Sequence, residues 1–412
     1  RSYLLAVIFF ITWNLQHMIR TAPNAGGVYA FQKRISGNDL GFIAFWFVLL
    51  TYLGILWSNI TAVPLFARFF LGNTFQFGFH YSLFGYSVWF GETLLAVAAI
   101  ALVGILCSVS SRLSSRIIIA ATLTFIAALS ACGVLAVIKH DPAFSYSPMF
   151  TGETHAFNQI IHIAAISPWA FIGFENISLF SEEYDFPHKK VRGILISSII
   201  ITTVLYLVVS LLSVSVYPPE YDSWLAYVRD SGNLQGIKSV PVFYAVHHYL
   251  GETGITVLMV TMLSVILTSL FGNLLALSRL LYAAGRDGEI HKGLSKLDAR
   301  GIPSTAIFSV IAITIFIPFL GRTAVGWIVD VTTLGAVFTY WLISHGVYLQ
   351  ARQTNLTLER YTGAAGMVLI GLCAILLLVP GILPLHGMEQ ESYILFVAWA
   401  LIGFAYFRWR LA

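Results

Sequence analysis

A glycine and a carboxylate lie side by side inside an apolar stretch, in Ile172-Gly173-Phe174-Glu175. A charged side chain near the centre of a bilayer costs about 2.5–3.5 kcal/mol on insertion scales, so it is a functional candidate by default. Gly173 allows backbone angles that interrupt a helix, and peptide groups freed at a break can bind both charged ends of a zwitterion. The alternative is that Gly173 is a small residue at a helix-packing contact.

Glu175 has two functional interpretations. It could bind a coupling proton, or it could tie its segment to a neighbouring helix and so hold the shape of a pocket. A purely structural, hydrogen-bonded glutamate is the alternative. Trp169, six residues earlier, offers an aromatic face on which a cationic group could stack, although a tryptophan in a membrane helix is often only a packing or interfacial residue.

Three further polar side chains lie within apolar segments. Asn59, in LWSNITAV, carries an amide whose buried groups need partners, which a ligand or another helix can supply. Thr268 and Ser269 form a hydroxyl pair that could contribute to an ion site. Hydroxyls in membrane helices more often bond back to their own backbone.

The composition sets the class of protein that positions these residues. The chain is 58% hydrophobic and 10% charged, whereas soluble domains are about 45–50% apolar and about 25% charged. This predicts an all-α polytopic membrane protein. No basic patch with interleaved aromatics suggests nucleic-acid binding, and no HExxH, GxSxG or His/Cys cluster suggests an enzyme or a metal site.

A helix needs about 20 apolar residues to cross the bilayer core, and on that basis the sequence predicts eleven spans. They lie near 3–19, 40–70, 86–108, 117–138, 158–183, 193–216, 254–284, 303–320, 327–349, 361–383 and 392–411. Residues 240–250 are expected to form a short helix outside the membrane.

The Lys and Arg residues divide unevenly between the two sides of these spans. Sixteen fall in one set of loops and the C-terminal tail: Arg20, Lys33, Arg34, Arg112, Arg116, Lys189, Lys190, Arg192, Arg286, Lys292, Lys296, Arg300, Arg352, Arg360, Arg408 and Arg410. The opposite loops hold four: Lys139, Arg229, Lys238 and Arg322. Because positive loops stay inside, we expect a plasma (inner) membrane protein with a cytoplasmic C-terminus. The sequence then begins on the outside without a signal peptide, so a preceding span is expected to be missing, and the spans present are numbered 2 to 12.

Three stretches together carry a family resemblance. WAFIGFENISLFSEEYDFPHKKVRGIL resembles the sixth-span signature of the amino acid–polyamine–organocation (APC) superfamily. Residues 269–307 resemble the end of span 8 and the loop that follows it. Residues 20–46 resemble the loop after span 2, which often reads "P…GG.Y.Y" in that superfamily.

The resemblance implies a five-plus-five inverted-repeat fold with two extra C-terminal helices. Residues 1–412 would form one transporter domain, with 1–138 the rest of the first repeat (spans 2–5), 158–349 the second repeat (spans 6–10) and 361–412 spans 11–12. It also implies a secondary active transporter of amino acids or related amines, working by alternating access. Spans 1 and 6 would both be broken, with the substrate between the breaks.

By the same resemblance, the substrate would contact Ile172, Gly173, Phe174, Glu175 and Asn59, and Trp169 would cap it on the outer side. Thr268 and Ser269 match the place of a sodium site in some relatives. No cofactor is implied beyond a coupling H⁺ or Na⁺. A membrane sensor that reads amino acids for a cytoplasmic partner is the alternative function. The sequence leaves the substrate, the coupling ion and the oligomeric state open.

One charged segment lies at the inner end of the predicted span numbered 6. Glu182, Glu183 and Asp185 precede the basic residues of 188–192. They resemble a cytoplasmic charge network that could lock an outward-facing state. A solvated loop of weak ion pairs is the alternative.

Overall fold

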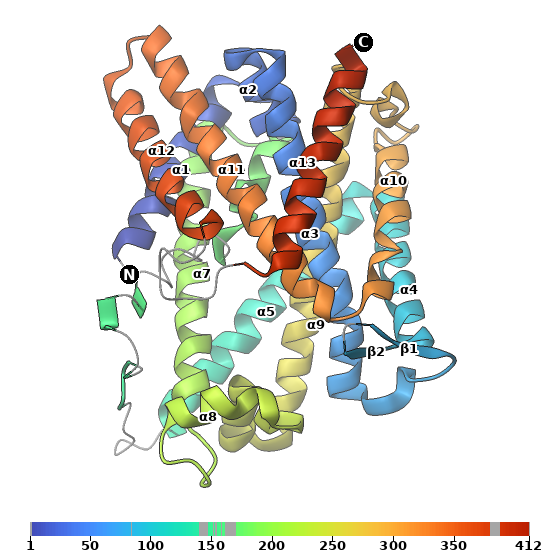
Figure 1. Ribbon diagram of the computed structural model, residues 1–412, viewed down its shortest axis with the longest axis vertical. Coiled ribbons are helices and arrows are strands. Elements are labelled where there is room, and N and C mark those ends of the chain that lie inside the picture. Colours follow the sequence, from blue (N-terminus) through green and yellow to red (C-terminus); the bar gives the residue numbers. More distant parts are fainter. Residues whose placement is uncertain are drawn as a thin grey trace.

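Long helices, several of them tilted, run side by side along the length of the molecule (Figure 1). The structure is a computed structural model and describes residues 2–83, 85–139, 147–150, 152, 155–157, 159–160, 170–379 and 388–411. The long helices are α1 (Ser2–Thr21), α3 (Asn38–Leu71), α4 (Phe90–Val109), α5 (Ser111–Lys139), α7 (Val191–Val214), α9 (Pro241–Arg286), α11 (Thr323–Gln353), α12 (Thr357–Leu378) and α13 (Gln390–Leu411). The shorter α-helices are α2 (Val28–Ser36), α8 (Trp224–Asp230) and α10 (Ser304–Thr314). The 3₁₀ helices are η1 (Gly72–Phe75), η3 (Phe174–Phe180), η4 (His188–Lys190), η5 (Ser231–Asn233), η6 (Gly236–Ser239), η7 (Lys292–Ser295) and η8 (Ile317–Leu320).

Eight helices in the described part of the chain are long and apolar enough to cross a membrane: α3, α4, α5, α7, α9, α11, α12 and α13. The prediction of an all-α polytopic membrane protein is therefore confirmed. The predicted span 303–320 corresponds to the shorter pair α10 and η8. The count of eleven spans and the inverted repeat stay predictions.

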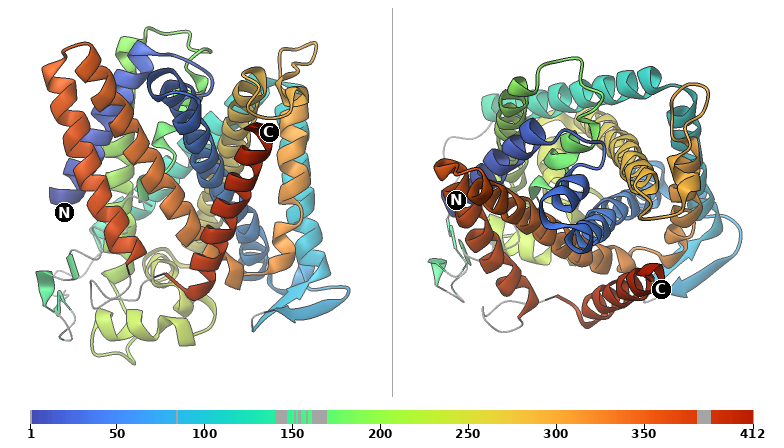
Figure 2. Two further views of the ribbon diagram at one scale, coloured as in Figure 1. Left: turned by 45° about the horizontal axis from the view of Figure 1, so that its top comes forward. Right: turned by 90° about the horizontal axis from the view of Figure 1, so that it is seen from above.

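The helices divide into a buried centre and an exposed periphery. α3 and α11 bury most residues of their most apolar stretch, whereas α7 and α13 bury few of theirs. The view from above shows α13 at the edge of the bundle (Figure 2). A helix that is apolar on all sides belongs either in a core or in lipid. α3 and α11 form the core, while side chains such as Leu123, Ile200 and Leu401 are more than half exposed on α5, α7 and α13.

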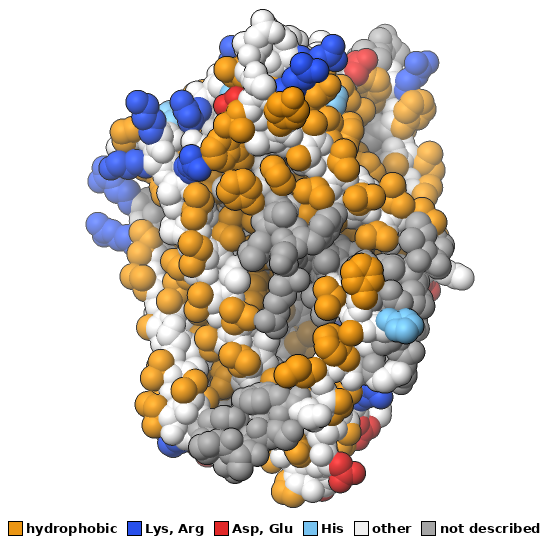
Figure 3. All heavy atoms as spheres, turned by 90° about the vertical axis from the view of Figure 1, so that its left-hand side faces the viewer, with side chains coloured by type: hydrophobic (Ala, Val, Ile, Leu, Met, Phe, Trp, Pro, Cys, Tyr) orange, Lys and Arg blue, Asp and Glu red, His pale blue; other side chains and the backbone are white. Residues whose placement is uncertain are grey.

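The two ends of the molecule differ in charge. α2, the α11–α12 turn and the C-terminus lie at one end, opposite α8 and the strands (Figure 1). On the face shown in Figure 3, hydrophobic side chains cover most of the height and Lys and Arg gather towards the α2 end. This end carries the loops in which the sequence places most of its positive charge.

A β-hairpin precedes α4, and the sequence did not predict it. β1 (His80–Leu83) pairs antiparallel with β2 (Tyr86–Trp89), so the expected helix at 86–108 begins only at Phe90. The prediction was wrong there because the apolar run of β2 continues directly into α4. Arg68 of α3 fixes the hairpin by donating to the Glu92 carboxylate and to the Ser87 carbonyl.

The expected short helix at 240–250 is present as the first part of α9. It ends at a kink at Gly251, whose φ is 62°, and the helix then continues to Arg286. In Figure 1 this first part lies beside α8 at the end opposite α2.

Candidate functional site

The described backbone from 170 to 180 contains turns and the 3₁₀ helix η3 in place of an α-helix. Gly173 has φ 107° and ψ −15°, a conformation in which an L side chain is strained. A Cβ built there would meet no atom of the described residues within 4 Å. The turn at Gly173, called the Gly173 interruption below because residues 170–180 are not α-helical, therefore depends on glycine for its backbone angles. Trp169 lies outside the described residues.

Glu175 anchors this segment through hydrogen bonds. Its carboxylate is 1% exposed and accepts hydrogen bonds from the Tyr52 hydroxyl (3.1 Å) and the Tyr340 hydroxyl (3.0 Å). It also accepts one from the Gly173 backbone N–H (3.0 Å). A carboxylate can accept several hydrogen bonds, and bonds to a charged acceptor are the stronger kind. Glu175 thus joins the turn at Gly173 to α3 and α11.

Neighbouring side chains extend this contact. Phe174 lies with its ring centroid 5.8 Å from that of Tyr340. The Asn176 amide nitrogen donates to the Gly272 carbonyl of α9 at 3.4 Å, and its Oδ1 is buried without a hydrogen-bond partner among the described residues. Ile172 is half-buried. The segment is therefore enclosed by three helices that are distant in sequence.

The loop before α2 holds the next part of the segment. The Ser181 hydroxyl accepts from the Asn24 backbone N–H (2.8 Å) and donates to the Asn24 carbonyl (3.0 Å). Gly27 has φ 52°, and a Cβ there would lie 2.6 Å from the Ser178 hydroxyl. Gly27 thus allows the backbone of this loop to approach η3 closely.

Two ion pairs fix the end of the segment. Arg279 of α9 is 6% exposed and donates to both carboxylate oxygens of Glu183, at 2.9 and 3.1 Å. Arg286 pairs with Glu182 at 3.3 Å. Two of the three predicted acidic residues, Glu182 and Glu183, therefore form ion pairs, but with α9 rather than with the basic residues that follow them in sequence.

The other predicted site residues bond within their own helices. The Asn59 amide donates to the Ile55 carbonyl at 2.7 Å, and the Thr268 hydroxyl donates to the Ser264 carbonyl at 2.8 Å. Ser269 accepts from the Asn273 amide through both its carbonyl and its hydroxyl. Asn59 lies two helical turns, about 10 Å, along α3 from the Glu175 contact. The structure thus brings Ile172, Phe174 and Glu175 together around Gly173.

The comparisons with known proteins decide the family. The profile described as "Amino acid permease" matches residues 2–406. The chain belongs to this amino acid permease family. It is thus an APC-superfamily permease and a multi-pass membrane protein, as the sequence predicted. Because the family transports amino acids, the prediction that the chain is not an enzyme is confirmed.

Two curated relatives align over nearly the whole permease. The branched-chain amino acid permease BcaP of Lactococcus lactis is 26% identical over 427 residues, which cover 98% of this chain and 85% of the relative. The aromatic amino acid transport protein AroP of Escherichia coli O157:H7 is 21% identical over 426 residues, covering 97% and 85%. A 294-residue match of 22% identity to the uncharacterized amino acid permease YecA of Bacillus subtilis covers 71% of this chain and 61% of the relative.

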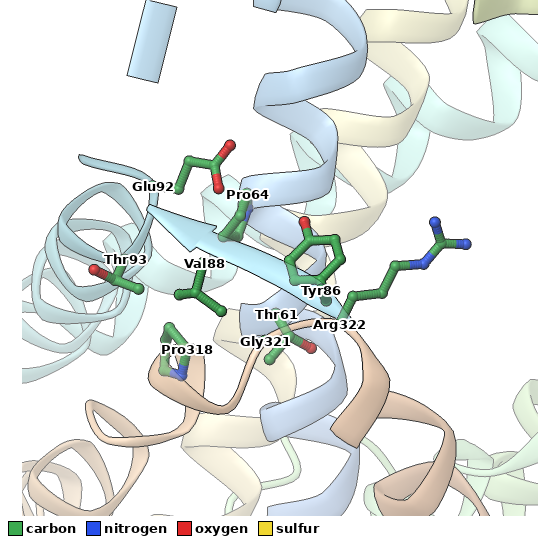
Figure 4. A pocket seen from close by; sticks show the side chains of 9 residues that line it. All are labelled: Thr61, Pro64, Tyr86, Val88, Glu92, Thr93, Pro318, Gly321 and Arg322. Atoms are coloured by element: carbon green, nitrogen blue, oxygen red, sulfur yellow. The ribbon is translucent and has the colours of Figure 1, made fainter. Parts of the chain in front are cut away.

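A small pocket of the permease lies beside the hairpin. Tyr86, Val88 and Glu92 line it together with Pro318 and Arg322, and Figure 4 shows Val88 next to Pro318 while the Arg322 side chain extends outward. Its volume is about 10 Å³, which is enough for roughly one water molecule. It is therefore too small to hold an amino acid.

Sequence reasoning missed Tyr52 and Tyr340. The available signal was a tyrosine near the middle of each of two long apolar helices, because a buried phenol usually finds a hydrogen-bond partner. That signal does not identify the partner, since Glu175 lies 123 residues from Tyr52 and 165 from Tyr340 in sequence.

Proposed function

We propose that this permease is a secondary active transporter that carries amino acids by alternating access and binds its substrate at the Gly173 interruption. The main support for this proposal is that the turn at Gly173, which requires glycine, lies beside the buried Glu175 carboxylate, which two helices hold by hydrogen bonds. Peptide groups at such a break can bind the carboxylate and ammonium groups that all amino acids share.

The substrate we favour is a large neutral amino acid. Glu175 is the one ionisable side chain in residues 170–180, and both of its oxygens already accept hydrogen bonds from the protein. A buried cationic side chain would need an available counter-charge. The names of the two relatives, a branched-chain and an aromatic transporter, support the same class.

The conformational change we propose moves one group of helices against another. α1, residues 170–183 and α7 would rock together, while α3, α4, α9 and α10 would form the scaffold. The Glu175–Tyr52 bond and the Glu183–Arg279 pair both join the first group to the second. Such contacts are specific to one state, and breaking them would accompany the transition.

The orientation and coupling ion belong to the same proposal. The charge distribution supports a plasma-membrane protein with its C-terminus in the cytoplasm. For coupling we favour H⁺ over Na⁺, because Thr268 and Ser269 are engaged within α9.

The test is counterflow into proteoliposomes of the full-length protein, using radiolabelled leucine, phenylalanine, lysine and putrescine. We expect leucine and phenylalanine to exchange, with uptake that responds to a pH gradient and not to replacement of sodium by choline. Exchange of lysine or putrescine without leucine would overturn the substrate class. Binding without exchange of any compound would overturn transport and favour the sensor alternative.

A further inference from the structure

A second cavity lies away from the Gly173 interruption, between α3, η8, α11 and α13. Its volume is about 320 Å³, and Trp57, Trp327 and Trp399 contribute three of its walls. Small-molecule sites start at about 300 Å³ and are mostly apolar and aromatic. No charged side chain among the described residues lines this cavity. The Thr332 hydroxyl donates to the Ile328 carbonyl of its own helix, and the indole N–H groups of Trp57 and Trp327 donate to Thr314 and Glu389. The buried indole N–H of Trp399 has no hydrogen-bond partner among the described residues. The cavity therefore suits a hydrocarbon and not a zwitterion.

The cavity connects the outer surface to the core of the bundle. At its mouth, the side chains of Leu320 and Leu395 are 41% and 43% exposed. At its floor, Ala324 is 3% exposed and Thr332 is fully buried. α13, which supplies the outer wall, lies at the periphery of the bundle in both Figure 1 and Figure 2. Exposed leucines on a peripheral helix of a membrane protein are side chains that lipid would contact.

We propose that this cavity binds one acyl chain of a bilayer phospholipid. Protein interiors are packed as densely as organic crystals, and unfilled apolar space costs stability in proportion to its volume. The surrounding bilayer offers acyl chains at high local concentration, directly at the exposed leucines of the mouth. A saturated chain carries no polar group that the tryptophan and leucine walls would leave unpaired.

The floor of the cavity links this site to the Glu175 anchor. α3 and α11 touch there, since a Cβ on Gly54 would lie 1.7 Å from the Thr332 hydroxyl. Tyr52 lies two residues from Gly54 on α3, and Tyr340 lies two turns further along α11 than Thr332. An acyl chain in the cavity therefore packs against the two helices that hold Glu175.

The experiment is photolabelling of the full-length protein in phosphatidylethanolamine vesicles that contain a phosphatidylglycerol with a diazirine on one acyl chain. Labelled peptides are mapped by mass spectrometry. We expect labelling within 317–332 and 395–399. Ala324→Phe, which fills the floor, should reduce it about tenfold, equivalent to about 1.4 kcal/mol of binding. Val397→Phe is the matched control, because Val397 is 54% exposed on α13 and does not line the cavity.

Equal labelling of these peptides in wild type and Ala324→Phe would overturn the proposal, as would labelling confined to exposed faces of α5 and α7. If Ala324→Phe is not monodisperse on size exclusion, Leu395→Trp replaces it, because Leu395 is exposed at the mouth and a larger side chain there blocks entry. Leu395→Trp should also reduce labelling about tenfold, and labelling equal to that of wild type would overturn the proposal. The readout needs no transport, so its failure is distinct from a failure of the proposed function.

Discussion

Removing the two phenol hydroxyls that hold Glu175 tests whether the anchor shapes the substrate site. In Tyr52→Phe or Tyr340→Phe, one of the three hydrogen bonds to the carboxylate is lost while the ring stays. A hydrogen bond to a charged group contributes about 1.5–3 kcal/mol, whereas interhelical bonds measured in a membrane protein reach about 1.7. We therefore take about 1.5 kcal/mol for each hydroxyl.

This loss should appear in substrate affinity. When the binding-competent geometry is less populated, the apparent dissociation constant rises by the same factor, and 1.5 kcal/mol corresponds to about tenfold. Each single variant should thus bind radiolabelled leucine up to about tenfold more weakly in a scintillation-proximity assay. The double variant should show a non-additive effect, because both hydroxyls share one carboxylate.

Tyr227→Phe is the matched control. Tyr227 is fully buried and donates to the Lys238 carbonyl at 2.8 Å, in the region of α8. All three substitutions should lower the melting temperature, but only those at Tyr52 and Tyr340 should weaken leucine binding. Unchanged affinity in both anchor variants, with melting shifts like that of the control, would refute the role of the anchor in binding.

The remaining predictions concern three other positions. Gly173→Ala should weaken leucine binding about tenfold, because a Cβ at φ 107° is strained by about 1–2 kcal/mol. The control is Gly193→Ala, which should bind leucine normally, because Gly193 also has no described atom near its Cβ position but has no positive φ. Equal leucine affinities of the two variants would contradict this prediction. Arg279→Glu should slow counterflow, because it breaks the ion pair with Glu183. Adding Glu183→Arg to the same chain should restore part of the counterflow rate. Absence of any rescue would show that the two residues do not act as a pair. Thr268→Ala should leave uptake and its independence of sodium unchanged, and a loss of uptake that excess sodium restores would reveal an ion site there.

Glu175 itself separates anchoring from proton carriage. In Glu175→Gln the amide oxygen can accept from Gly173 and Tyr340, while the NH₂ can donate to the Tyr52 hydroxyl. The anchor account predicts that this variant keeps leucine binding within a few fold, whereas Glu175→Ala loses it. If Glu175→Gln binds leucine but abolishes uptake driven by a pH gradient, the carboxylate is the proton carrier.

The long apolar helices were predictable because their hydrophobic runs are long enough to cross the bilayer. α3, and α9 after its kink at Gly251, match their predicted spans closely. The binding roles predicted for Asn59 and Thr268 stay predictions, but both side chains have partners within their own helices. The predicted ligand Asn59 satisfies its amide on the carbonyl four residues earlier, as does the hydroxyl of Thr268. The partners of Glu175 could not be found from one sequence, because they depend on how distant helices pack.

Photo-leucine labelling maps the substrate site most directly. The full-length protein in proteoliposomes is irradiated with the diazirine analogue of leucine, and the labelled peptides are identified by mass spectrometry with and without excess leucine. Labelling within residues 170–180 that leucine removes is the predicted result. Leucine-protected labelling elsewhere, with 170–180 unlabelled, would contradict a substrate site at the Gly173 interruption.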